Sequence, residues 1–311
     1  MALTDELVEP FERVTEAAAS VLLADRYGIP DATATRLDTE RDDTFHVASA
    51  FGEFVLKVAN PADDPLVINL QTAAMGFAAE VDPGIPVQKV LPSLDGDIEA
   101  DLDGRVMRVL TWLPGELLRS AARTPDNLEA FGRVQGRLAA ALEDFRHPAA
   151  GRELAWDVER LPQLRPLLEF APDVAPVLDR FDAGRIAALP HQVVHNDLNL
   201  DNVVVSDGHP DFVTGILDFG DVVHTARAAD LAVSLSYLLD GGWASVQPVI
   251  DGYQRACRLT DDELELLPML VEGRLAQRIL LAEWLAHTAP ANAEYVRRNL
   301  DLSRAQLAAL R

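Results

Sequence analysis

A polar segment between two apolar, strand-like runs carries the residues of this sequence that are best suited to chemistry. The segment is VVHNDLNLDNVVVSDG, residues 193–208, and its polar core holds His195, Asn196, Asp197, Asn199, Asp201 and Asn202. A surface turn needs one Asn or Asp and a Gly. So many carboxylates and amides at one point indicate a site that binds a metal ion or accepts a proton.

A second motif, GILDFGD at residues 215–221, places Asp218 at the end of another strand-like run. If the two runs pair as a hairpin through SDGHPD, Asn202 and Asp218 come near the same end. Amide and carboxylate oxygens of this kind are the ligands that Mg²⁺ prefers. Asp197, at the turn of the loop, is then free to accept the proton of a substrate hydroxyl. This combination of a metal and an orienting carboxylate is what phosphoryl transfer requires.

The alternative interpretation is structural. Asp197 and Asn202 would only satisfy backbone groups of a turn, and Asp218 would only end a strand. Both motifs occur in the expected order, each in a strand–loop setting, and together they favour the chemical interpretation. His195 is expected to brace the loop by hydrogen bonds rather than to take part in a reaction.

The sequence contains only two lysines, Lys57 and Lys89. Lys57 stands inside the apolar run FVLKVA, which predicts a point charge directed into a cleft, where it would contact phosphate groups. The alternative is a lysine on an edge strand, where its charge opposes aggregation. Lys89, in VQKVLP, is expected at the surface.

The hydrophobic pattern predicts two halves of different character. The first half reads as a helix over 4–27, a hairpin of TFHVAS and FVLKVA, a helix over 65–80, and strands at VQKVLPS and RVMRVLTWL. The second half reads as helices over 126–186 and after 228, with short strands at QVVH, NVVVS and FVTGILDF. We therefore expect an α+β fold with a sheet-rich N-terminal lobe over 1–110 and a helix-rich C-terminal lobe over 111–311.

Composition limits the classes of partner. The 311 residues include 27 basic and 50 acidic side chains, a net charge of −23. Nucleic acid and anionic membranes both demand basic surface, so neither is an expected partner. An acidic surface suits a cationic small molecule, although solubility alone also explains it. The single cysteine, Cys257, excludes an internal disulfide, and no secretory or spanning segment is recognisable, so we expect a soluble, cytoplasmic protein.

The motifs HNDLNLDN and ILDFGD, with Lys57 upstream and the connector TWLPG, resemble the aminoglycoside phosphotransferase and choline kinase family of protein-kinase-like enzymes. The resemblance covers roughly residues 15–290. Further segments, among them VLKVANP and GIPVQKVLPSLDG, are similar to the hydroxylysine kinase-like branch. The resemblance implies a bilobal protein-kinase-like fold that binds ATP or GTP between its lobes, with Mg²⁺.

The same resemblance implies roles for individual residues at the nucleotide. Lys57 would contact the nucleotide phosphates. Thr111, Trp112 and Leu113 would form the hinge, with backbone bonds to the purine. Gln71 stands where the family has a glutamate partner for the lysine, and its oxygen can hold Lys57 without a charge.

For the reaction itself, the resemblance implies that Asp197 is the catalytic base and that Asn202 and Asp218 are the Mg²⁺ ligands. His195 and Asp230 would support the catalytic loop, Asp230 from the following helix. An ordinary carboxylate at a helix start is the alternative for Asp230.

Two departures from the family pattern concern backbone freedom. The phosphate-covering loop DTERDDTF lacks glycine, so backbone donors approach phosphates less freely. Arg41, Asp43 and Thr44 are the candidates for contact with the nucleotide there. Asn196 replaces the glycine common between the loop His and Asp, and Asn tolerates unusual backbone angles.

We expect a kinase that phosphorylates a hydroxyl of a small, amine-bearing compound, with hydroxylysine as the favoured acceptor. Acids in DDELELL and arginines in VRRNL are expected to line the acceptor pocket. An aminoglycoside, homoserine or choline kinase is the alternative within the class. Outside it, the alternatives are a nucleotide-binding pseudokinase and a Mg²⁺-dependent hydrolase, which would release free phosphate.

Overall fold

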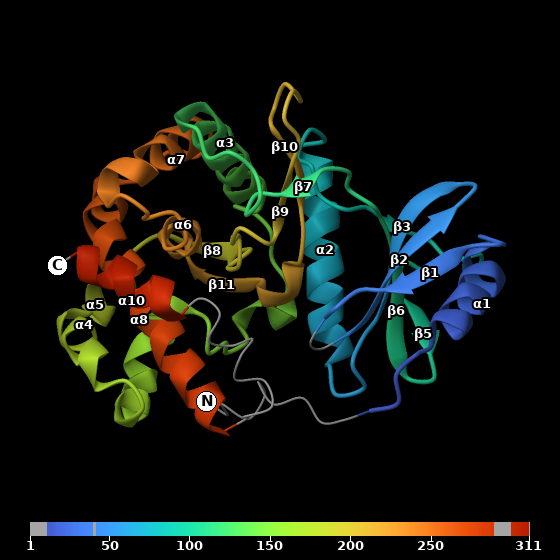
Figure 1. Ribbon diagram of the computed structural model, residues 1–311, viewed down its shortest axis with the longest axis horizontal. Coiled ribbons are helices and arrows are strands. Elements are labelled where there is room, and N and C mark those ends of the chain that lie inside the picture. The colour runs from blue at the N-terminus through green and yellow to red at the C-terminus, as the bar shows by residue number, and fades with distance from the viewer. Residues whose placement is uncertain (1–10, 40–41, 289–299, 311) are drawn as a thin grey trace.

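The computed structural model describes residues 11–39, 42–288 and 300–310. A sheet flanked by two helices lies at one side of the molecule, and most of the helices gather at the other (Figure 1). This is the predicted α+β arrangement of a sheet-rich N-terminal lobe and a helix-rich C-terminal lobe. None of the helices within the described ranges combines the length and the apolar character that crossing a bilayer would require.

The N-terminal sheet is antiparallel at every pairing, in the order β1-β2-β3-β6-β4 with β5 also paired to β6. Its strands are β1 Thr33–Arg36, β2 Asp43–Ser49, β3 Gly52–Val58, β4 Val90–Leu91, β5 Ala100–Leu102 and β6 Arg105–Thr111. The β2–β3 hairpin is tight: Ser49 lies opposite Gly52, whose φ of 118° suits glycine alone. In the central strand β3, Lys57 lies between Thr44 of β2 and Arg108 of β6.

Successive side chains of β3 face opposite sides of the sheet. Leu56 and Val58 belong to a small apolar cluster with helix α1 (Glu16–Tyr27). Val55 belongs instead to the large apolar cluster of the C-terminal lobe. Lys57 has the same parity as Val55, so the strand directs its side chain toward the C-terminal lobe.

Helix α2 (Pro65–Val81) lies between the sheet and the helical lobe (Figure 1). It begins where the sequence predicts, because the Asp64 side chain accepts a hydrogen bond from the Leu66 N–H (2.8 Å) and Pro65 occupies the first turn. Four of its buried residues pack into the large cluster of the C-terminal lobe: Leu70, Ala74, Met75 and Ala78.

The C-terminal lobe combines helices with two small sheets. Its α-helices are α3 Pro125–Ala141, α4 Ala175–Arg180, α5 Ala183–Ile186, α6 Arg227–Leu235, α7 Trp243–Ala256, α8 Asp261–Thr288 and α10 Leu300–Ala309. Its 3-10 helices are η2 Pro148–Gly151, η3 Val158–Glu169, η4 Pro172–Val174 and η5 Phe219–Asp221.

Each polar motif is flanked by one strand from each of two small sheets. One sheet has the order β10-β9-β7, with β7 Glu116–Leu117, β9 Val203–Val205 and β10 Val213–Ile216. The other pairs β8 (His191–Val194) with β11 (Val223–Ala226). Loop 195–202 therefore leaves β8 and enters β9, and loop 217–222 leaves β10 and enters β11. The predicted hairpin between the strands after and before the two motifs is confirmed as the antiparallel β9–β10 pair.

Helices α3 and α7 touch along their backbones. A Cβ atom at Gly132 of α3 would lie 2.0 Å from the Val249 carbonyl oxygen, and one at Gly252 of α7 would lie 2.1 Å from the Glu129 carbonyl oxygen. Only glycine permits so close an approach.

Three features differ from the predicted elements. Helix α1 begins at Glu16, where the Thr15 side chain caps it (3.2 Å from the Ala18 N–H), so residues 11–15 of the predicted helix are not helical; residues 4–10 lie outside the described part. Strands β5, β7 and β11 were not predicted, since runs of two to four residues show no period. The region predicted as helical over 126–186 contains the 3-10 helix η3, whose internal Pro162 and Pro166 remove donors that an α-helix needs.

We predict that Gly132→Ala destabilises the protein by about 1–3 kcal/mol or more, because the added methyl group would overpack the α3–α7 contact. A shift of the urea midpoint at unchanged m-value measures the effect. Gly76→Ala is the matched control: Gly76 is exposed on α2 with nothing within 4 Å of an added Cβ. It should be stabilising by about 0.5–1 kcal/mol, and equal effects at both positions would contradict the role of close packing.

Candidate active site

Asp197 lies at the centre of loop 195–202, with both carboxylate oxygens held. Asn199 Nδ2 donates to Oδ1 (3.0 Å), and Asn202 Nδ2 donates to Oδ2 (2.7 Å) and to the Asp197 carbonyl oxygen (2.8 Å). The side chain keeps 24% of its surface exposed. The carboxylate is therefore oriented by its neighbours and still reachable by a ligand.

His195 connects the two polar loops. Its Nε2 lies 2.9 Å from the Leu217 carbonyl oxygen, so that nitrogen must carry the proton. Its Nδ1 then accepts from the Asp197 N–H (3.2 Å). Burial lowers the pKa of His195, in keeping with a neutral ring that donates at one nitrogen and accepts at the other.

Asp230 of α6 supports the same loop from behind. Its Oδ1 accepts a hydrogen bond from the Asn196 N–H (2.7 Å), and its Oδ2 accepts one from Gln135 Nε2 of α3 (3.1 Å). Asn196 adopts a φ of 65°, the left-handed conformation that Asn tolerates better than most residues. The backbone before Asp197 is thus anchored to two helices.

Asn202 and Asp218 offer oxygens suited to a metal ion. The Leu217 N–H donates to the Asn202 carbonyl (2.9 Å) and ties the two loops together. Asp218 Oδ1 accepts from the Gly220 N–H (3.1 Å). Within the described ranges, Asn202 Oδ1 and Asp218 Oδ2 have no hydrogen-bond partner.

The donor set fits Mg²⁺ better than a transition metal. No group of three or more His, Cys, Asp or Glu side chains with metal-binding geometry occurs in the described part of the chain. An amide and a carboxylate oxygen suffice for Mg²⁺, which keeps several waters and takes further oxygens from phosphates. Asn202 and Asp218 are the residues that would hold it.

Lys57 interacts electrostatically with Asp218. It is the strongest influence lowering the pKa of Asp218, and it outweighs the opposing effect of burial. Lys57 Nζ lies 3.7 Å from Asp42 Oδ2. The lysine of the sheet and the carboxylate of the DFG motif, far apart in sequence, therefore lie close enough to influence each other electrostatically.

Gln71 does not contact Lys57, contrary to our prediction. Its Oε1 accepts from Arg108 Nη2 (3.0 Å), and the neighbouring Thr72 hydroxyl binds Nη1 of the same guanidinium (3.0 Å). Arg108, beside Lys57 in the sheet, takes the amide because it is 2% exposed and needs buried acceptors. Asp42 occupies the place of the carboxylate partner of Lys57.

In the predicted hinge, Thr111 to Leu113, several backbone N–H and carbonyl groups already have hydrogen-bond partners and are not free to bind a purine. Thr111 uses both its N–H, with the Lys89 carbonyl (2.9 Å), and its carbonyl, with Gln88 Nε2 (3.0 Å). The Trp112 N–H donates to a carbonyl of β3 (3.3 Å). Within the described ranges, the Trp112 carbonyl and the Leu113 N–H remain without partners and could meet the edge of a purine.

The candidates in the phosphate-covering loop do not reach the site. Arg41 lies outside the described residues. Asp43 is fully buried and accepts from Arg36 Nη1 (2.7 Å) and Arg105 Nη2 (2.8 Å). Thr44 is also buried, at 4% exposure. Asp43 and Thr44 therefore belong to the core of the sheet, which corrects their prediction as nucleotide contacts.

Two charged residues that the sequence did not single out act on Asp197. Burial, followed by the nearby Asp221 carboxylate, raises the pKa of Asp197 to about 8, and Arg274 and the Asn199 hydrogen bond oppose that rise. Arg274 of α8 has Nη2 3.9 Å from Asp197 Oδ1. Asp221 ends the DFGD motif, which was a visible signal, whereas nothing in the sequence distinguishes Arg274 from other helical arginines.

One acid of the segment DDELELL is buried in the protein interior. Glu263, in DDELELL, is buried and binds Arg227 through both oxygens (3.0 and 2.6 Å), so it is committed to an internal ion pair. Residues 296–299 of VRRNL lie outside the described part.

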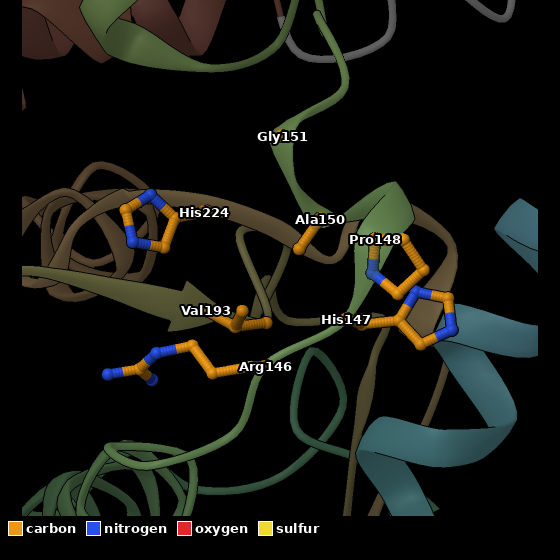
Figure 2. A pocket seen from close by; sticks show the side chains of 7 residues that line it. All are labelled: Arg146, His147, Pro148, Ala150, Gly151, Val193 and His224. Atoms are coloured by element: carbon orange, nitrogen blue, oxygen red, sulfur yellow. The ribbon is translucent and has the colours of Figure 1, made fainter.

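Two cavities in the described part of the chain lie away from these residues. One, of about 310 Å³, is lined by Val193, His224 and five residues between Arg146 and Gly151, and Figure 2 shows the two histidine rings on opposite sides of it. The other, of about 330 Å³, lies between the start of α3 and the β9–β10 turn. Neither is lined by Asp197, Asn202 or Asp218.

Comparison with known proteins identifies relatives across most of the chain. The model of the phosphotransferase enzyme family matches residues 33–267. A hydroxylysine kinase of Danio rerio is 29% identical over 299 residues, which cover 87% of this chain and 84% of that protein. A homoserine kinase of Azorhizobium caulinodans is 30% identical over 264 residues, 78% of this chain and 77% of that protein.

A solved structure shares the fold at lower sequence identity. The amicoumacin kinase hAmiN, in complex with AMP-PNP, Ca²⁺ and Ami, superimposes with a TM-score of 0.67 at 17% identity and covers 92% of this chain and 93% of that one.

We predict that Lys57→Met raises the pKa of Asp218, because it removes the cation that lowers that pKa most. The carboxyl carbon shift of Asp218, followed by NMR against pH, measures the change. Lys89→Met is the control, since Lys89 is the only other lysine and is exposed. If the pKa of Asp218 is the same in the wild type, Lys57→Met and Lys89→Met, Lys57 does not act on Asp218.

Proposed function

The chain belongs to the phosphotransferase enzyme family and is a small-molecule kinase, and on this premise we propose that it transfers the γ-phosphoryl group of ATP or GTP to a hydroxyl of hydroxylysine. One observation carries the proposal: the oriented, partly exposed carboxylate of Asp197 lies near oxygens of Asn202 and Asp218 that have no hydrogen-bond partner among the described residues, and Lys57 acts on the same cluster. The hydroxylysine kinases similar over most of the chain support the acceptor.

Asp197 would act on the acceptor hydroxyl. Its two amide hydrogen bonds leave the remaining lone pairs of the carboxylate for that hydroxyl. As the hydroxyl oxygen forms its bond to the γ-phosphorus, the bond from that phosphorus to the β,γ-bridging oxygen breaks and the nucleoside diphosphate leaves. The hydroxyl proton passes to Asp197.

The nucleotide would lie between Lys57 and the hinge. Lys57 would contact its phosphates, and the Trp112 carbonyl and Leu113 N–H would bind the purine edge. Asn202 and Asp218 would hold Mg²⁺, which when bound neutralises charge on the phosphate oxygens. Asp42, 3.7 Å from Lys57, supplies the carboxylate that Gln71 lacks, so Lys57 keeps an ionic partner.

Homoserine is the second candidate acceptor, favoured by the similarity to homoserine kinases over 70–78% of the chain. Homoserine and hydroxylysine both carry a hydroxyl, an amine and a carboxylate, and they differ in length and in the second amine of hydroxylysine. The same catalytic groups would serve either one.

A product screen tests the proposal. Purified protein with Mg²⁺ and ATP or GTP is given hydroxylysine, homoserine, choline, ethanolamine or an aminoglycoside, and products are detected by mass spectrometry. We expect a phosphorylated amino acid from the wild type and a loss of turnover of about 10²–10⁴-fold in Asp197→Asn, which removes the base.

Nucleotide binding by Asp197→Asn should stay near the wild-type value, and Asp144→Asn, an exposed change after α3, should keep full turnover. Full activity of Asp197→Asn would rule out the assigned base. Free phosphate without a phosphorylated acceptor would instead favour hydrolysis.

The rate should depend on pH through Asp197. The base must be ionised, and its pKa is raised to about 8, so kcat/KM for the acceptor should increase as pH rises toward that value. Asp221→Asn removes a carboxylate that raises this pKa and should move the acidic limb to lower pH. Initial rates between pH 5.5 and about 9 measure the acidic limb of the pH–rate profile. If the limb lies at the same pH in the wild type and in Asp221→Asn, it does not report the ionisation of Asp197.

A further inference from the structure

Arg278 of α8 is a buried guanidinium with unused hydrogen-bonding capacity. It is 5% exposed. Its Nη1 donates to the Ser236 carbonyl oxygen (3.1 Å), and its guanidinium carbon lies 3.8 Å from the centre of the Tyr237 ring. Its Nη2 is buried without a hydrogen-bond partner, and no carboxylate lies at ion-pair distance, as far as the described ranges extend.

Such an arrangement is unfavourable in the absence of an anion. A buried charge needs a counter-charge and acceptors for its N–H groups. Burial lowers the pKa of Arg278, as expected for a cation that has lost water and gained no carboxylate. The Tyr237 ring fixes the plane of the guanidinium, and Nη2 is the nitrogen left to donate to an anion.

Arg278 lies on α8 near the aspartate that would bind the acceptor hydroxyl. Arg274, four residues earlier on the same face of α8, has Nη2 3.9 Å from Asp197 Oδ1. Its Nε is also buried and unpartnered among the described residues. Four residues advance a helix by about 6 Å, so Arg278 lies roughly one helical turn beyond the point where Arg274 meets the catalytic loop.

Arg278 lies on the side of Asp197 from which α8 approaches: Arg274, one turn before it, has Nη2 3.9 Å from Asp197 Oδ1, whereas Lys57 Nζ lies 3.7 Å from Asp42 Oδ2 at the sheet. The charged groups that act on it include Arg274, Asp197 and Arg119. Lys57, which would contact the phosphates, acts instead on Asp218. An anion at Arg278 would therefore belong to the molecule whose hydroxyl meets Asp197.

We propose that Arg278, with Arg274 beside it, forms a subsite for the carboxylate of the acceptor, so that this kinase selects hydroxylated amino acids over amino alcohols that lack a carboxylate. The inference rests on the kinase function proposed above and narrows its acceptor. An acceptor with a few carbons between hydroxyl and carboxylate would span the helical turn from Asp197 to Arg278. An amino alcohol would leave Arg278 buried and unpaired.

Matched acceptor pairs test the subsite in the wild-type protein. Hydroxylysine is compared with 1,5-diaminopentan-2-ol, and homoserine with 3-aminopropan-1-ol; each pair differs only in the carboxylate. We expect kcat/KM to be about 10- to 100-fold higher for the amino acid, the size expected for charge-assisted hydrogen bonds. Equal or faster phosphorylation of the decarboxylated compounds, or of choline alone, would overturn the subsite and leave the kinase function intact.

Arg278→Met keeps most of the side-chain volume and removes the charge. We expect KM for the amino acid to rise about 10- to 100-fold, with KM for ATP and the rate with the decarboxylated partner unchanged. Arg278→Lys should recover part of the loss, because it restores the charge without the bidentate geometry. Arg185→Met, at an exposed arginine of α5, should behave as wild type. A rise in KM for ATP instead would assign Arg278 to phosphate and overturn the proposal.

If no acceptor is phosphorylated, the proposed function is contradicted. A binding measurement then tests the carboxylate subsite separately. Hydroxylysine is titrated calorimetrically into wild-type protein with AMP-PNP and Mg²⁺. Binding that is lost in Arg278→Met and for 1,5-diaminopentan-2-ol would still support a carboxylate subsite. Absence of hydroxylysine and homoserine binding to the wild type would overturn it.

Discussion

The hydrogen bond from the Asn196 N–H to the buried Asp230 carboxylate positions the whole reactive loop. It fixes the left-handed residue that precedes Asp197, and Gln135 of α3 holds the same carboxylate from the other side. Helix α3 is itself seated on α7 through Gly132, where no other residue would fit. The orientation of one carboxylate thus depends on a contact between two helices that carry neither Asp197 nor the candidate metal ligands.

The surroundings of the site shift the pKa values of Asp197 and Asp218 in opposite directions. Lys57 lowers the pKa of Asp218, so that carboxylate stays charged and suited to a cation. Burial and Asp221 raise the pKa of Asp197 to about 8, close to the range in which a base exchanges protons readily. Neighbouring carboxylates with pKa values moved in opposite directions are a recurring sign of divided roles at an active site.

The bulk charge of the chain is a poor guide to the acceptor. A net charge of −23 is compatible with a cationic substrate, yet α8 places the buried Arg274 beside Asp197 and the buried Arg278 four residues further along the helix. In the proposed subsite, both cations would stabilise an acceptor that carries a negative group. Local burial, rather than total charge, sets which ligand a site stabilises.

The sequence by itself determined the residues whose chemistry is local. Asp197, Asn202 and Asp218 lie in short motifs between strand-like runs, and Lys57 stands out because lysine is so rare here. The two lobes followed from a change of hydrophobic period. The tertiary structure alone decided which groups meet: Gln71 binds Arg108 rather than Lys57, Asp43 is enclosed by arginines, and Arg274 of α8 lies beside Asp197. The local sequence around a helical arginine is the same whether the side chain faces solvent or a buried carboxylate, because an element distant in sequence supplies its partner.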